Sequence, residues 1–125
     1  MSKVIWYSQH DPTPTQVEAI RKLYPDLNLQ KDPEPFRGAD DIVSRFLSEG
    51  AIDMHVVAPM GVVRELCVRG LFPLWSVMRQ TSCSKAEVHV HKGRKWRCYT
   101  FHTLHRVKDI KMILEDPTPN NSIPQ

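Results

Sequence analysis

Short apolar runs alternate with helical patterns along most of the sequence, and this alternation constrains the fold more than any other feature. The apolar runs lie at residues 3–8, 27–30, 54–58 and 71–78. Apolar residues at helical spacing fill the three intervals between them. Strands that alternate with helices are joined in parallel by right-handed crossovers, which place helices on both faces of the sheet. The sequence therefore predicts an α/β fold with a wound, mainly parallel sheet.

The first predicted helix has the clearest start. Thr13 can act as the N-cap, Pro14 takes the first helical position, and Gln16 completes a capping box. Two further helices are predicted, one over residues 40–48 and one over residues 62–70. Residues 31–38, which hold Pro33 and Pro35, are predicted to form a loop before the first of these two helices.

The last part of the chain changes character. Residues 87–91 and 96–107 flank a Lys-Gly-Arg turn and predict a β-hairpin. Residues 116–125 hold three prolines and no apolar pattern, which predicts a disordered tail. The predicted organisation is one small Rossmann-like α/β domain over residues 1–115, with helices on both faces and the hairpin at one edge of the sheet.

Composition and charge exclude several classes of protein. No apolar run approaches the roughly 20 residues of a membrane-spanning helix, and the first residues lack the pattern of a signal peptide. We therefore expect a cytoplasmic protein with no membrane partner. Residues 1–50 carry six basic and eight acidic side chains, against eleven and six in residues 51–125. The basic excess peaks in the hairpin, where it is either a phosphate-attracting patch or ordinary solvated surface.

The three cysteines are Cys67, Cys83 and Cys98, an odd number without a CxxC pair. This pattern argues against a disulfide framework and against a structural zinc knot. Cys67 falls on the apolar face of the third predicted helix, so we expect it to be a small buried hydrophobe.

Histidines in the predicted hairpin raise the question of a metal site. His89 and His91 share one face of a strand, and His102 and His105 lie in the partner strand. No further ligand stands at a convincing spacing, so we expect neither a metal nor a cofactor.

Polar turns follow the predicted strands at the edge where wound sheets bind ligands. His10, after the first strand, can donate a proton or hold a phosphate, or it can simply bond to backbone. Arg79, at the end of the fourth strand, offers a fork suited to phosphate, or forms a surface ion pair. Neither a dinucleotide-binding nor a P-loop motif is present. The other candidate ligand-binding residues in these turns are Ser8, Gln9, Thr13, Met60, Gly61, Gln80 and Thr81.

Three stretches together resemble a known family. They are residues 4–16 (VIWYSQHDPTPTQ), residues 70–75 (GLFPLW) and the His- and Arg-containing last strand, residues 101–106. Their order and spacing are similar to those of small CRISPR-associated accessory proteins related to the CRISPR-associated Rossmann-fold group. Members of that group sense cyclic oligoadenylates, and some, called ring nucleases, degrade them.

The resemblance implies a metal-independent ring nuclease in prokaryotic antiviral signalling or its evasion. A ribose 2′-hydroxyl would attack the adjacent phosphodiester, with His10 protonating the leaving oxygen and Arg79 neutralising charge. Ser8 and Gln9 would position the ligand, a cyclic oligonucleotide rather than a long nucleic acid. A symmetric ring suits a homodimer, which the aromatic residues of the hairpin also favour. The alternatives are a non-catalytic sensor or sponge, a phage or prokaryotic accessory protein that binds another protein, and, least favoured, a metal hydrolase.

Overall fold

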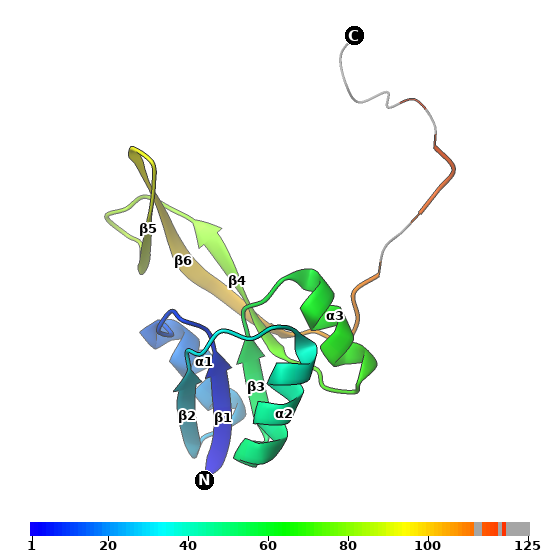
Figure 1. Cartoon of the computed structure of the whole chain (residues 1–125). Coiled ribbons are helices and arrows are strands. Elements are labelled where there is room, and N and C mark those ends of the chain that lie inside the picture. The colour runs from blue at the N-terminus through cyan, green and yellow to red at the C-terminus, as the bar shows by residue number, and fades with distance from the viewer. Residues whose placement is uncertain (112–113, 118, 120–125) are drawn as a thin grey trace.

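The structure, a computed structural model, describes residues 1–111, 114–117 and 119. Figure 1 shows a sheet flanked by helices, with a long hairpin projecting away from it. In chain order the elements are β1 (Ser2–Tyr7), α1 (Pro14–Leu23), β2 (Leu27–Asp32), α2 (Ala39–Glu49), β3 (Asp53–Val56), α3 (Met60–Val68), β4 (Leu74–Gln80), β5 (Val88–Lys92) and β6 (Lys95–Arg106). The predicted α/β fold is confirmed.

The strands form one six-stranded sheet in the order β2-β1-β3-β4-β6-β5. The first four of these are parallel, while β6 runs antiparallel to both β4 and β5. The only registered pair between β3 and β4 joins His55 to Leu74, so β4 runs on past the end of β3. The outer part of β4 and the β5–β6 hairpin therefore project beyond the core, and we call residues 78–103 the hairpin arm (Figure 1).

Helices cover both faces of the parallel strands, as the alternation predicted. On one face, α2 and α3 pack Ile42 and Leu66 against Ile5 and Met54. On the other face, α1 packs Ile20 against the neighbouring side chains of β1. Because successive residues of a strand point to opposite sides, one run of β1 supplies both cores.

Local signals placed most element boundaries within a few residues. The capping box of α1 forms as predicted: Gln16 N–H donates to Thr13 Oγ1 at 3.2 Å, and Thr13 N–H donates to Gln16 Oε1 at 2.8 Å. Strand β4 begins at Leu74, later than predicted, because Pro73 cannot donate a ladder hydrogen bond. Helix α3 starts earlier than predicted, at Met60 with Pro59 as its N-cap.

One partly buried ion pair joins the end of β6 to the core. Arg106 donates from its two terminal nitrogens to the two carboxylate oxygens of Asp53, at 3.0 and 2.6 Å. Tyr24 Oη donates to the same carboxylate at 2.6 Å. Asp53 is only 5% exposed, and these bonds satisfy its charge.

The expectation that the cysteines form no disulfide is wrong. Cys83 and Cys98 form a disulfide, because the loop after β4 folds over β6 and brings their Cα atoms to 5.0 Å. An odd count and a 15-residue separation gave no sign of this pairing in the sequence. Cys67 is a free, buried thiol, as predicted.

The sequence also predicted a disordered tail and no membrane-spanning helix. The tail predicted over residues 116–125 falls mainly on positions 118 and 120–125, which lie outside the described residues. Over the part of the chain that is described, none of the helices has the length and apolar character needed to cross a membrane.

Candidate ligand site at the carboxyl ends of the strands

A hollow of about 310 Å³ lies where the winding of the sheet reverses. The chain leaves β1 for β2 on one side and later returns to β3 on the other side of β1. Wound sheets bind their ligands in the crevice at this point. The hollow is lined by Ser8, Gln9, His10, Pro33, Glu34, Pro35, Phe36 and Val57. The structure thus brings together the three predicted site residues that follow β1.

Hydrogen bonds hold the turn after β1 in a fixed shape. The Trp6 indole donates to the His10 carbonyl at 2.7 Å, and the His10 amide donates to Ser8 Oγ at 3.1 Å. Because Ser8 Oγ accepts the His10 amide, the hydroxyl hydrogen is left to donate to a ligand. The His10 side chain is exposed at the rim of the hollow. The turn therefore presents one hydroxyl and one imidazole together.

The start of α3 lies at the same end of the sheet. The amide of Val57, just before α3, donates to the Tyr7 carbonyl at 3.3 Å, which ties this loop to the end of β1. No side chain caps α3, and the amides of Val62 and Val63 both turn back to the Pro59 carbonyl. Met60, at the first position of the helix, is exposed. Met60 and Gly61 do not line the hollow, although Val57, three residues before Met60, does.

Thr13 does not have the place that the sequence suggested. Its side chain is only 6% exposed, and the capping box engages both its hydroxyl and its amide. Because these hydrogen bonds use backbone N–H groups at the start of α1, this helix has fewer free N–H groups for an anion than α3 has. Thr13 therefore stabilises α1 and does not contact the hollow.

Arg79 and its neighbours lie outside the hollow. Trp6 and Leu74 both pair with His55, so they stand at the same height in the sheet. Arg79 is five residues beyond Leu74, while Ser8 is two residues beyond Trp6. The difference of three residues, at about 3.3 Å each, puts Arg79 roughly 10 Å further along the strand direction. Gln80 and Thr81 lie further still, and the Thr81 amide donates to the Cys98 carbonyl at 2.9 Å.

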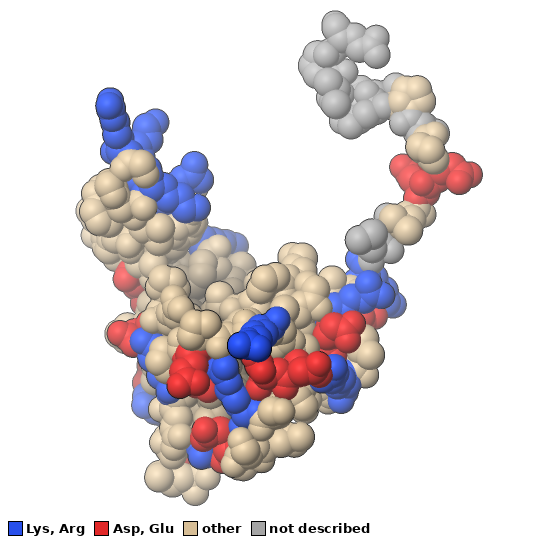
Figure 2. Space-filling model, in the orientation of Figure 1, with Lys and Arg blue, Asp and Glu red and all other residues tan. Residues whose placement is uncertain are grey.

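The charge around the hollow differs from the charge of the arm. The lining contains one carboxylate, Glu34, and no lysine or arginine. The nearby Lys31 binds Asp11 at 2.7 Å, and this hydrogen bond lowers the pKa of that carboxyl. Figure 2 shows the cationic side chains gathered instead at the tip of the arm. The exposed cations there are Lys92, Arg94, Lys95 and Arg97.

A buried polar cluster stands behind the site, and the sequence reasoning missed it. His55 is 1% exposed, and its Nε2 lies 2.6 Å from Ser76 Oγ. Gln16 donates to the same hydroxyl at 3.0 Å. Burial lowers the pKa of His55 to about 4, against the opposing effect of the Asp53 charge, so the imidazole is neutral near pH 7.

This cluster reaches the turn after β1 through an aromatic contact. The His55 ring stacks on the Trp6 indole with ring centroids 4.0 Å apart. The same indole holds the His10 carbonyl. His55 therefore supports the position of His10 without approaching a ligand. In the sequence His55 fell inside a predicted strand, and only its contacts with Ser76 and Trp6 in the fold reveal its role.

Comparisons with protein-family profiles, with curated proteins and with solved structures find no match to this chain. The class of the protein follows from its own features: an α/β domain with a wound sheet and a polar hollow at the reversal point.

Proposed function

We propose that this chain is a metal-independent ring nuclease that acts on a cyclic oligoadenylate in the cytoplasm. The observation that supports this most is the meeting of Ser8, Gln9 and His10 at the hollow where wound sheets bind ligands. The family resemblance supplies the substrate class and its antiviral setting.

The proposed reaction is an internal transfer of a phosphodiester. The ribose 2′-oxygen bonds to the adjacent phosphorus and gives up its proton to water, while the bond from phosphorus to the 5′-oxygen breaks. The leaving 5′-oxygen takes a proton from the His10 imidazolium, and the product carries a 2′,3′-cyclic phosphate. Ser8 and Gln9 hold the ligand in line for this displacement. The exposed imidazole of His10 can regain its proton from water.

The rest of the ring extends beyond the hollow. A volume of about 310 Å³ is at the lower limit for a small-ligand pocket, so several nucleotides do not fit inside it. We expect the rest of the ring to reach the uncapped start of α3 and, further along β4, Arg79. The cations of the arm raise the local concentration of an anionic ligand. A homodimer would present two such hollows to a symmetric ring.

A second candidate function is a sensor or sponge that binds the ring without cutting it. The absence of lysine and arginine from the lining of the hollow favours this alternative. Cleavage develops negative charge on the phosphoryl oxygens, and a fixed cation at that place is what stabilises it best. Binding needs only hydrogen bonds and charge at longer range.

One assay separates these functions. Purified protein is incubated in EDTA with cyclic oligoadenylates of several ring sizes, and the products are separated by chromatography. His10→Ala is expected to slow cleavage by roughly 10²- to 10⁴-fold, with a much smaller effect on the dissociation constant. His102→Ala, at an exposed histidine of β6, is the matched control.

The outcomes of this assay differ for each candidate. Cleavage that His10→Ala leaves unchanged would move the chemistry to other residues, and cleavage abolished by EDTA would contradict the metal-independent mechanism. Tight binding without cleavage would replace the nuclease with the sensor or sponge. A protein that neither binds nor cleaves any ring would contradict both.

A further inference from the structure

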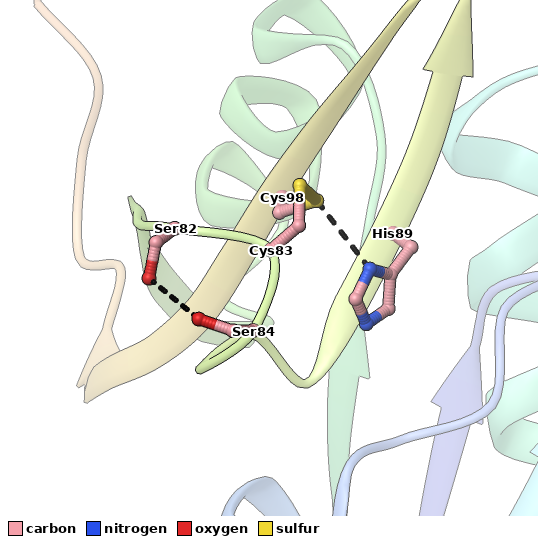
Figure 3. The surroundings of a disulfide bond; sticks show 5 residues. All are labelled: Ser82, Cys83, Ser84, His89 and Cys98. Atoms are coloured by element: carbon pink, nitrogen blue, oxygen red, sulfur yellow. Dashed lines mark hydrogen bonds between the residues drawn. A yellow bond between two sulfur atoms is a disulfide. The ribbon is translucent and has the colours of Figure 1, made fainter.

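The base of the hairpin arm brings together two sulfurs and one imidazole. Cys83 comes from the loop before β5, while His89 of β5 and Cys98 of β6 are direct partners in the ladder. The three potential ligand atoms lie within 4.8 Å of one another, and His89 Nδ1 is 3.4 Å from Cys98 Sγ. Figure 3 shows the imidazole pointing toward the disulfide. These three residues lie outside the hollow proposed as the nuclease site.

The donor atoms and their spacing match one metal in particular. Two thiolates and an imidazole are characteristic zinc ligands, with bonds of about 2.3 Å to sulfur and about 2.0 Å to nitrogen. A tetrahedral ion with these bond lengths separates sulfur from nitrogen by roughly 3.6 Å. The observed 3.4 Å between Cys98 Sγ and His89 Nδ1 is close to this value. Sulfurs that are bonded to each other are not thiolates, so only the reduced protein can supply the complete set.

We propose that Cys83, His89 and Cys98 form a zinc site when the disulfide is reduced. The β5–β6 ladder fixes His89 and Cys98, and Cys83 lies in an exposed loop where its side chain can rotate away from Cys98. The site opens on a hollow lined by Cys83, His89 and Trp96, which leaves room for water as the fourth ligand. The disulfide is the oxidised, metal-free state of the same cluster.

The two states are connected by a balanced reaction. A trialkylphosphine reduces the disulfide: the S–S bond breaks, two thiols form, and the phosphine gains the oxygen of one water molecule as its oxide. Zinc then replaces the two thiol protons, which are released to the solvent. The reducing cytoplasm would favour the thiol state of the pair.

Cobalt(II) provides the test, because it occupies zinc sites and is coloured. The full chain is reduced with a trialkylphosphine under nitrogen, freed of metal, and titrated with Co²⁺ alone. We expect one equivalent to bind, with sulfur-to-cobalt charge-transfer bands in the near ultraviolet, strong visible bands of a tetrahedral ion, and displacement by Zn²⁺. Reduced protein that shows no such bands, or that binds Co²⁺ only in octahedral form, would contradict the proposal.

Substitutions identify the ligands. Cys83→Ser is expected to remove the charge-transfer bands of that thiolate, and His89→Ala, which keeps both cysteines, to weaken Co²⁺ binding by more than about 100-fold. His91→Ala, on the same face of β5, and Cys67→Ser, at the buried thiol, are controls that should bind normally. Equal binding by His89→Ala and His91→Ala would overturn the assignment. Because the nuclease assay contains EDTA, each proposal can fail without the other.

Discussion

The wound core and the hairpin arm are stabilised by different kinds of interaction. The core engages buried polar groups in hydrogen bonds, as in the contacts of Asp53 with Arg106 and of His55 with Ser76, while Tyr7 Oη and His55 Nδ1 are buried without a partner among the described residues. The arm leaves its charges in solvent and has one nearly completely buried side chain, Cys98, among its described residues. Strand pairing, the disulfide and a few polar contacts hold the arm in place instead.

One such polar contact joins the arm to the core. Glu87 accepts hydrogen bonds from Thr15 of α1 at 2.6 Å and from Thr100 of β6 at 2.8 Å. The Thr15 bond is the main cause of the lowered pKa of this carboxyl. We therefore expect a substitution in the core to destabilise the whole molecule, and a substitution in the arm to have a local effect only.

The largest effect is expected from truncation in the core. Ile42 is fully buried between α2 and the sheet, so Ile42→Ala should lower the free energy of unfolding by about 2 to 5 kcal/mol. Trp96→Ala removes a larger side chain, but this side chain lies in the arm and is 60% exposed. The substitution should therefore change the free energy of unfolding by less than about 0.5 kcal/mol. Urea unfolding followed by circular dichroism measures both, and equal losses would erase the distinction between the two regions.

Because His55 is buried in the core as a neutral imidazole, we expect the free energy of unfolding to fall in acid. His55 has a pKa of about 4 in the fold and an ordinary value of 6.5 when unfolded, so the unfolded state binds more protons between these values. The contribution of the neutral His55 to the free energy of unfolding is therefore complete above pH 6.5 and is lost as the pH drops toward 4. From pH 7.5 to 4.5 the loss should be about 2 to 3 kcal/mol.

Replacing the buried histidine should remove most of this pH dependence. His55→Gln keeps a hydrogen-bonding side chain near Ser76 but has no group that titrates in this range. His102→Gln, at an exposed position of β6, is the control and should keep the wild-type slope. Urea unfolding at several pH values measures both slopes. Identical slopes for His55→Gln and the wild type would mean that another group causes the acid sensitivity.

The smallest global effect is expected from opening the disulfide. In oxidising buffer, Cys83→Ser should speed hydrogen exchange of the β5 amides while changing the urea midpoint little, because the bond lies in the arm. Hydrogen exchange read by mass spectrometry gives the local effect. Faster exchange throughout β1 and β3 would show that the disulfide of the arm also stabilises the core, which would contradict a purely local effect.

The sequence predicted what depends on local pattern. The alternation of elements specified the wound sheet, and Thr13 with Gln16 marked the start of α1. Ser8 and His10 were placed correctly at the carboxyl end of β1, because that position follows from the end of one strand. The grouping of the three turn residues after β1 needed no knowledge of distant contacts.

Features that depend on register or on loop paths were missed. The place of Arg79 depends on how far β4 outruns β3, which no local pattern encodes. The Cys83–Cys98 bond depends on a loop folding back over β6. His55 sits in an apolar strand, and its partners Ser76 and Gln16 come from distant parts of the chain.

We propose that a cyclic oligoadenylate binds at the hollow after β1 and not along the arm alone. Amide chemical shifts of the ¹⁵N-labelled protein test it most directly, with each ring size added in EDTA. We expect the largest shifts at residues 8–10, 34 and 57, with the start of α3 next and smaller, salt-sensitive shifts at residues 92–97. Shifts confined to residues 92–97, or no shifts with any ring, would contradict it.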